Sequence, residues 1–248
     1  MRGYGQVMTT NDVAERDGAP WPVLAAGTTT DIFLISEDRV LRRYRDVHDA
    51  TTEAALMRHV AKYGFPVPTL YSSEGSDLLM ERLHGPTLLQ ALAAGELSLQ
   101  DGADIMGDLH QRLHSVPAPR GTPVDDVVVH LDLHPANIIL SESHGPALVD
   151  WANASTGSPD LDIAVSAIII GEVAVDSTGD YSRMARALLV AFLAVAGGDP
   201  LARLDSAAAA RIADPALEDS EKTLVAPAAA LVRWYSRDVI IGGEDTAS

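Results

Sequence analysis

The stretch His130-Leu-Asp-Leu-His-Pro-Ala-Asn137, followed by Val149-Asp150-Trp151, is the most informative part of this sequence. It places a carboxylate, an amide and a second carboxylate around one short loop and one hairpin. Magnesium prefers hard oxygen ligands, and a protein usually supplies only one or two of them beside phosphates and water. Asn137 and Asp150 suit that task, and Asp132 suits the orientation and deprotonation of an acceptor hydroxyl. The pattern therefore indicates magnesium-assisted phosphoryl transfer.

The composition is that of a globular protein. Hydrophobic residues make up 47% of the 248 positions and charged residues 21%, and this length allows one domain or two lobes. The absence of Cys excludes disulfides and thiolate metal sites. Residues 1–18 are too polar for a signal peptide, and the most apolar run, Ile163 to Val175, is too short to span a bilayer. We therefore expect a cytoplasmic protein with no membrane contact.

The formal net charge is −17, from 18 basic and 35 acidic residues. Such a field repels nucleic acid and anionic membranes, and it favours cationic small molecules in an acidic cleft. The alternative is that the negative charge only keeps the protein soluble. Net charge affects how a protein associates with others, and it does not identify a binding site. We expect no nucleic acid partner, and the sequence leaves the oligomeric state open.

The first third of the chain is expected to form five strands and one helix. β-Branched and aromatic residues with short turns predict the strands. Apolar residues at helical spacing predict the helix over residues 49–63, with Gly64 as its stop. The strands are expected at residues 23–25, 31–36, 39–44, 69–72 and 78–83. Together they make a small α+β lobe, residues 1–83.

Beyond Gly85 the pattern becomes mainly helical. Ser98 can cap a helix with an apolar face, and residues 161–173 are apolar nearly all round, so they should form a buried helix. A strand at 127–129 and a hairpin of 138–140 with 147–149 surround the opening motif. Further helices are expected at residues 87–94, 181–195, 201–212 and 227–235. This larger lobe comprises residues 84–248.

The spacing of the motif carries the prediction more than any single residue in it. One Asp or Asn here would more often be a turn residue or a helix cap. His-x-Asp-x4-Asn on a loop before a hairpin, with Asp at the far end of the hairpin, is the context that a kinase catalytic loop requires. A competing hypothesis takes His130, Asp132 and His134 as an alternating metal triad. Pro135 and the lack of a further ligand at suitable spacing weaken it.

In these residues the sequence resembles the aminoglycoside phosphotransferase and choline kinase family, small-molecule kinases related in fold to protein kinases. The catalytic loop of that family is similar to His-Gly-Asp-x-His-Pro-x-Asn, and its metal segment to Ile-Asp-Trp followed by Gly-x-Pro-x-x-Asp-Leu-Ala. Here the second part is Gly157-Ser-Pro159-Asp-Leu-Asp162-Ile-Ala164. The resemblance covers about Gly27 to Ala164. His134, where protein kinases carry Lys, and Trp151 favour the small-molecule branch.

The resemblance implies a two-lobed, protein-kinase-like α+β fold. It implies ATP, or another nucleoside triphosphate, and Mg²⁺ as cofactors, and a hydroxylated small molecule as the acceptor. Asp132 would be the catalytic base, with His134 supporting the phosphate or the loop. Asn137 and Asp150 would bind the metal.

The same resemblance bears on two further positions, Asp162 and Leu131. Asp162 would brace the catalytic loop from the following helix. Leu131 departs from the family pattern, because Gly usually occupies its place. A larger side chain there alters the packing of the loop or the acceptor pocket, while the three functional groups stay in register.

The small lobe should hold the nucleotide. Kinases place a strand-three Lys on the phosphates and fix it with a Glu on the following helix. Arg42 and Glu53 occupy those places here, and Arg can hold phosphate in a bidentate manner. Strand alternation would turn Arg42 into the cleft and Arg43 away from it. The alternative is that the basic residues between positions 39 and 45 form a solvated edge.

Backbone groups would complete the nucleotide site. Gly27 and Thr28 begin the turn Gly27-Thr-Thr-Thr30, whose N–H groups could cover the phosphates, although a bare turn explains it equally well. The backbone of Glu81 and Leu83, where the fifth strand meets the second lobe, would bond the adenine.

The acceptor is the least determined part of the prediction. Acidic residues beyond the motif could bind a cationic acceptor such as an aminoglycoside, but solvated helix ends explain them better. These residues are Asp176, Asp180, Glu218, Asp219 and Glu221. A metabolic kinase of choline, sugar or amino-alcohol type is an alternative, and so is a nucleotide-binding pseudokinase scaffold. A protein kinase is disfavoured, because residues 152–159 are too short for a usual activation segment.

Overall fold

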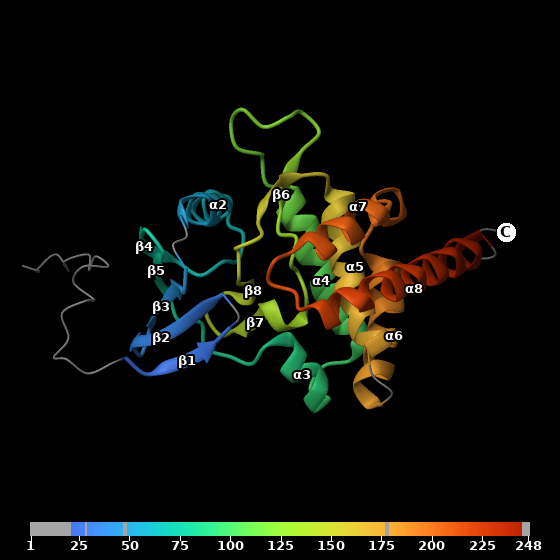
Figure 1. Cartoon of the computed structure of the whole chain (residues 1–248), viewed down its shortest axis with the longest axis horizontal. Coiled ribbons are helices and arrows are strands. Elements are labelled where there is room, and N and C mark those ends of the chain that lie inside the picture. Colours follow the sequence, from blue (N-terminus) through green and yellow to red (C-terminus); the bar gives the residue numbers. More distant parts are fainter. Residues whose placement is uncertain (1–20, 28, 47–48, 177–178, 245–248) are drawn as a thin grey trace, which may run out of the picture.

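A computed structural model of the chain describes residues 21–27, 29–46, 49–176 and 179–244. They form two lobes, one built on a five-stranded sheet and one that is mostly helical (Figure 1). This is the α+β architecture expected from the sequence. No helix in these ranges is long and apolar enough to cross a membrane.

The sheet of the first lobe is antiparallel throughout, with the strand order β1-β2-β3-β5-β4. Its strands are β1 (Val23–Ala26), β2 (Thr30–Ser36), β3 (Arg39–Tyr44), β4 (Leu70–Glu74) and β5 (Asp77–Glu81). Helix α2 (Thr51–Ala61) covers one face, where Ala54 packs with Val40 and Leu78. Leu41 packs on the other face with Leu79, as the alternation of side chains along a strand requires.

Strand β5 ends at Glu81, two residues before the predicted end at Leu83. Glu81 pairs with Arg39, the first residue of the neighbouring strand, so no partner strand remains beyond it. The N–H of Arg82 instead donates to the carbonyl of Asp38 in the β2–β3 turn, at 2.9 Å. Arg82 and Leu83 therefore belong to the link between the lobes.

The second lobe is organised around one buried helix. Helix α5 contacts α6, α7 and α8 (Figure 1), because it is apolar on every side, with Ile163, Ile168 and Ile170 buried. Capping boxes begin α3 and α4. The helices are α3 (Leu88–Ala94), α4 (Leu99–His114), α5 (Pro159–Asp176), α6 (Asp180–Val195), α7 (Pro200–Ala213) and α8 (Asp219–Glu244).

Helix α8 corrects one prediction. It begins at Asp219 rather than at Pro227, which lies inside the helix. Proline within a helix costs about 3 kcal/mol, so the pattern favoured a start at that residue. Burial of Val225, Ala228 and Val232 in the core offsets this cost.

The segment that carries the opening motif lies on the side of the second lobe that faces the sheet (Figure 1). It comprises β6 (Val127–Val129), the 3₁₀ turn η1 (Pro135–Asn137) and the hairpin of β7 (Ile138–Ser141) and β8 (Gly145–Leu148). The hairpin bonds to the α2–β4 connection, where Leu148 N–H donates to the carbonyl of Pro66, and to the inter-lobe link, where Leu140 N–H donates to the carbonyl of Pro86. Strand β6 pairs with β9 (Ser155–Gly157). The sequence did not predict β9, since Ser155, Thr156 and Gly157 form no apolar run of the kind that marks β6.

Candidate active site

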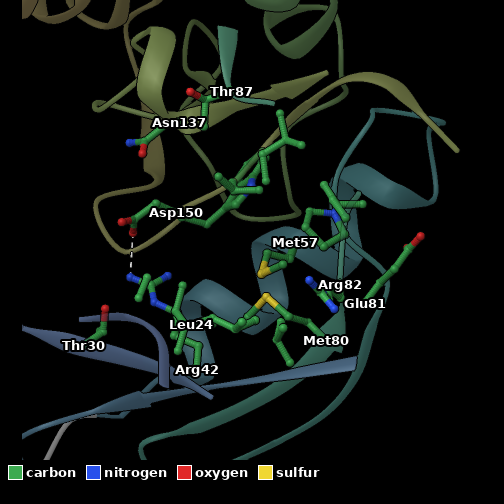
Figure 2. Close-up of a pocket in the computed structure, with 18 of the residues that line it drawn as sticks. Leu24, Thr30, Arg42, Met57, Met80, Glu81, Arg82, Thr87, Asn137 and Asp150 are labelled. Atoms are coloured by element: carbon green, nitrogen blue, oxygen red, sulfur yellow. Dashed lines mark hydrogen bonds and ion pairs between the residues drawn. The ribbon is translucent and has the colours of Figure 1, made fainter. Parts of the chain in front are cut away.

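A cavity of about 430 Å³ lies between the sheet and the hairpin of the second lobe (Figure 2). Its wall is mainly apolar, with Met57 and Met80 side by side in the close-up. Its polar groups include Arg42, Asn137 and Asp150. A mostly apolar cavity with a few convergent polar groups is typical of a small-molecule site.

Arg42 reaches across this cavity. Its Nη1 donates to Glu53 Oε1 at 2.6 Å. Its Nη2 donates to Asp150 Oδ1, also at 2.6 Å (Figure 2). The Arg42 and Glu53 side chains are 6% and 3% exposed. Burial alone would lower the pKa of Arg42, but the charges of Asp150 and Glu53 outweigh it and raise the pKa. Arg42 therefore stays charged and ties the sheet lobe to the end of the hairpin.

The neighbouring arginines of β3 and the following turn behave differently from Arg42. Arg43 and Arg45 are exposed and pair with Asp77 and Asp31. The solvated-edge alternative thus describes these two residues and not Arg42. Alternation along β3 explains the difference, because residues 42 and 43 point to opposite faces of the sheet.

Asp132 is held by Asn137, five residues later. The Asn137 Nδ2 donates to Asp132 Oδ2 at 2.9 Å and to the Asp132 carbonyl at 3.0 Å. Burial would raise the pKa of Asp132, but His134, His130 and Arg211 outweigh it and hold the pKa below its usual value. Asp132 is therefore ionised at neutral pH and able to accept a proton. Arg211, on α7, was not singled out from the sequence.

His134 supports the loop in which Asp132 lies. Its Nδ1 accepts from the N–H of Ala136 at 3.3 Å and so caps the 3₁₀ turn. Its Nε2 lies 3.7 Å from Asp132 Oδ1. Because Nδ1 is an acceptor, Nε2 carries the hydrogen and points it at the carboxylate.

Asp162 braces the same loop from α5. It is fully buried and accepts from the N–H groups of His130 and Leu131, the latter at 2.7 Å, and from His114 Nε2 at 2.9 Å. Burial would raise the pKa of Asp162, but these partners and the charge of His110 lower it to about 2. Leu131, which supplies the second of these two N–H groups, has a φ of 60°. That left-handed conformation is the reason why Gly suits this position.

Trp151 anchors the segment after Asp150. Its ring is fully buried, its Nε1 donates to the carbonyl of Leu148 at 3.0 Å, and it makes edge contacts with Phe65 and His130. Asp150 itself has a φ of 62°. The buried ring before the turn into β9 thus holds a strained residue at the rim of the cavity.

Asn137 and Asp150 also fit a magnesium ion. Because Asn137 uses its Nδ2 for Asp132, its Oδ1 remains for a cation, and no described residue bonds to Asp150 Oδ2. Two hard oxygen ligands are what a protein usually gives Mg²⁺. The described residues contain no group of three His, Cys, Asp or Glu side chains arranged to hold a metal, so the triad hypothesis has no support.

The family follows from the sequence comparison. Residues 21–126 and 122–204 match the model described as the phosphotransferase enzyme family. The chain belongs to this family. No curated protein sequence gives a match.

Solved structures confirm the fold of this phosphotransferase. The aminoglycoside phosphotransferase APH(4)-Ia has 14% identity and a TM-score of 0.56, over 88% of this chain and 93% of that chain. A thermostable mutant of the same enzyme with AMP-PNP and hygromycin B has 15% identity and a TM-score of 0.56, over 88% and 93%. The streptomycin–ATP complex of APH(2")-IIa has 14% identity and a TM-score of 0.50, over 86% and 88%. The kinase-like architecture expected from the motif is therefore correct.

The link between the lobes of this phosphotransferase is only partly available to a ligand. Glu81 donates its N–H to the carbonyl of Thr69, and its carboxylate accepts from Thr69 N–H and from His144. Figure 2 shows this carboxylate turned away from the cavity. In the described part of the chain, no hydrogen bond engages the N–H of Leu83, which lines the cavity.

The turn after β1 differs from its prediction. Gly27 donates its N–H to the carbonyl of Thr30 at 2.8 Å and does not line the cavity. Thr28 lies outside the described residues. Thr30 and Leu24 line the cavity instead (Figure 2). In the sequence, only the alternation of side chains along the first two predicted strands could have pointed to these two residues.

Proposed function

We propose that this phosphotransferase moves the γ-phosphate of ATP to a hydroxyl of a small molecule, with Mg²⁺ bound. The observation that supports it best is the contact of Asn137 with Asp132, which orders an ionised carboxylate beside two oxygen ligands. Asp132 orients the acceptor hydroxyl and accepts its proton. The acceptor oxygen bonds to the γ-phosphorus, the bond to the bridging oxygen breaks, and ADP leaves.

The other residues position the nucleotide. Mg²⁺, held by Asn137 and Asp150, offsets the charge of the phosphates. Arg42 binds the phosphates that are not transferred, and the N–H of Leu83 bonds the adenine. Because the N–H of Glu81 already donates to Thr69, the carbonyl of Glu81 is the group left to bond the adenine. We place the functional boundary at this link, with residues 1–83 binding nucleotide and residues 84–248 carrying out catalysis.

Two acceptor classes are in contention. The net charge of −17 favours a cationic acceptor, and structural relatives are described in complexes with streptomycin, gentamicin and hygromycin B. A small cavity beside the catalytic loop, lined mainly by apolar residues such as Leu131, Leu161 and Val165, favours instead a metabolic alcohol, sugar or amino alcohol. Either reaction consumes ATP, which agrees with the expected cytoplasmic location.

The test is ADP release from ATP with a panel of hydroxylated compounds, with and without Mg²⁺. Asp132→Ala should abolish turnover and leave the Kd for ATP within about twofold, while Asp150→Ala should abolish turnover and weaken Mg²⁺-dependent binding. Asp104→Ala, an exposed acidic residue on α4, is the matched control and should keep full activity.

A pseudokinase scaffold would behave differently. It would bind nucleotide and show neither acceptor-dependent ADP release nor a slow magnesium-dependent ATPase. Full activity of Asp150→Ala would contradict the metal assignment.

A further inference from the structure

A second cavity, of about 230 Å³, lies beside the catalytic loop and shares no residue with the nucleotide cavity. Its wall comes from the catalytic loop, from Asn153 before β9, from α5 and α7, and from the turn after α7, all in the second lobe. Leu131 belongs to the catalytic loop, Leu161 and Val165 to α5, and Ala210 and Arg211 to α7. It is smaller than the ~300–1,000 Å³ that is usual for drug-sized ligands.

This cavity borders the catalytic loop next to Asp132, the residue that would take the proton of the acceptor. Leu131 directly precedes Asp132 in the chain, and Arg211 is near enough for its charge to lower the pKa of Asp132. The turn from α7 to α8, which contributes Asp214 and Pro215, lies on the side of the helical lobe that faces the sheet lobe (Figure 1). On its other flank, Asp132 contacts Asn137, which lines the nucleotide cavity.

The charged side chains in the wall of this cavity, Arg211 and Asp214, are both engaged by ion pairs. Arg211 donates through Nε and Nη2 to the two oxygens of Glu172, at 3.3 and 2.9 Å, and its Nη1 lies 3.7 Å from Asp214. The Arg211 and Glu172 side chains are only 12% and 10% exposed. Asp214 is the only carboxylate in the wall, and six of the nine wall residues are apolar.

We propose that this cavity receives the acceptor, and that the acceptor is a compact alcohol with an apolar body and at most one positive charge. The inference rests on the function proposed above and narrows its substrate class. A polycation would have to place ammonium groups beside a guanidinium, with one carboxylate that is already paired, and burial of unpaired charge is costly. The exposed acids Asp176, Glu218, Asp219 and Glu221 do not line the cavity.

The chain contains no Cys, so one substitution provides a selective probe of the cavity. Ala210→Cys places a thiol in the wall, and Ala209→Cys, the preceding and also exposed residue of α7, is the matched control. The rate of maleimide labelling is measured with Mg²⁺ and AMP-PNP present. Cyclohexanemethanol, choline and ethanolamine are compared with hygromycin B and gentamicin.

At least one compact alcohol should slow labelling of Ala210→Cys by about threefold or more, as expected when it occupies about two-thirds of the cavities or more. Labelling of Ala209→Cys should stay unchanged, and neither aminoglycoside should protect. Protection by the aminoglycosides alone, or protection by none of the five compounds, overturns the proposal. This result does not depend on turnover, so it is separable from failure of the phosphotransfer function, which would appear as absent ADP release in the wild type.

A steric test locates the acceptor. Ala210→Phe should lower kcat/KM for the best alcohol by about 10- to 100-fold, because the ring occupies the cavity, and should leave the KM for ATP within about twofold. Ala209→Phe is the control of equal size and should keep both constants. Equal effects of the two substitutions, or an unchanged kcat/KM in Ala210→Phe, overturn the assignment of this cavity.

Discussion

Arg42 and Asp150 lie 108 positions apart, yet a 2.6 Å ion pair joins them across the nucleotide cavity. The same guanidinium is held by Glu53, so α2, β3 and the end of the hairpin converge on one buried cation. Because Asp150 is also the proposed magnesium ligand, Arg42 orients it through Oδ1 and leaves Oδ2 for the metal. The contact therefore couples the geometry of the small lobe to that of the metal site.

Removal of Arg42 should destabilise the fold as well as the site. Arg42→Met leaves the buried carboxylate of Glu53 without its cation, which should cost about 3–5 kcal/mol of unfolding free energy in urea titrations. The double variant Arg42→Met with Glu53→Met removes both charges and should recover most of that loss. A double variant no more stable than the single one would show that the pair is not the cause.

Asp162 should make the free energy of unfolding fall as the pH is lowered. Its pKa of about 2 lies below the ordinary value of 3.8, so its contribution is complete above about pH 4 and is lost as the pH falls towards 2. The difference corresponds to about 2 kcal/mol at neutral pH. Asp162→Asn should be less stable than the wild type by this amount at pH 7 and nearly equal to it near pH 2.

Urea unfolding at a series of pH values measures this difference. The control is Asp176→Asn, an exposed residue at the end of the same helix, which should change stability by no more than about 0.5 kcal/mol. A constant difference between Asp162→Asn and the wild type across the whole range would refute the prediction.

At position 131, Gly should give a more stable protein than Ala, the reverse of the usual order. A residue with a side chain pays about 1–2 kcal/mol in the left-handed conformation, and Gly does not. Leu131→Ala loses core packing and keeps the strain, whereas Leu131→Gly loses the packing and relieves it. The Gly variant should therefore be more stable than the Ala variant by about 1 kcal/mol. The opposite order, measured by urea unfolding, would contradict this account.

Replacement of Gly85, in the inter-lobe link, should lower the free energy of unfolding strongly. Gly85 has a φ of 144°, and a Cβ there would lie 2.0 Å from the carbonyl oxygen of Leu140. Gly85→Ala must separate the link from β7 and should cost about 3 kcal/mol or more. Gly75 also has a positive φ but has open space around it, so Gly75→Ala should cost only about 1 kcal/mol. Similar losses in thermal unfolding would show that strain, not the clash, dominates.

Local patterns predicted most of the fold. Alternation along 39–44 and the apolar helix after it predicted the two elements and turned Arg42 into the cleft, because strand and helix periods are short-range properties. The kinase-like resemblance then named Glu53 as the partner of Arg42. The errors occurred where packing overrode such patterns. Pro227 stays inside α8 because its neighbours are buried, and β5 stops at Glu81 because its partner strand ends there.

The sequence by itself determined the family of this chain and the local arrangement of its proposed site. Asp132, Asn137 and Asp150 keep their relation because a short loop and a hairpin set it locally. Only the tertiary structure decided that Arg42 bonds to Asp150, that Leu131 adopts a left-handed backbone against Asp162, and that Arg211 closes a small apolar cavity beside the catalytic loop. These contacts join distant segments, so they depend on how the helices and the sheet pack, and no local period contains that information.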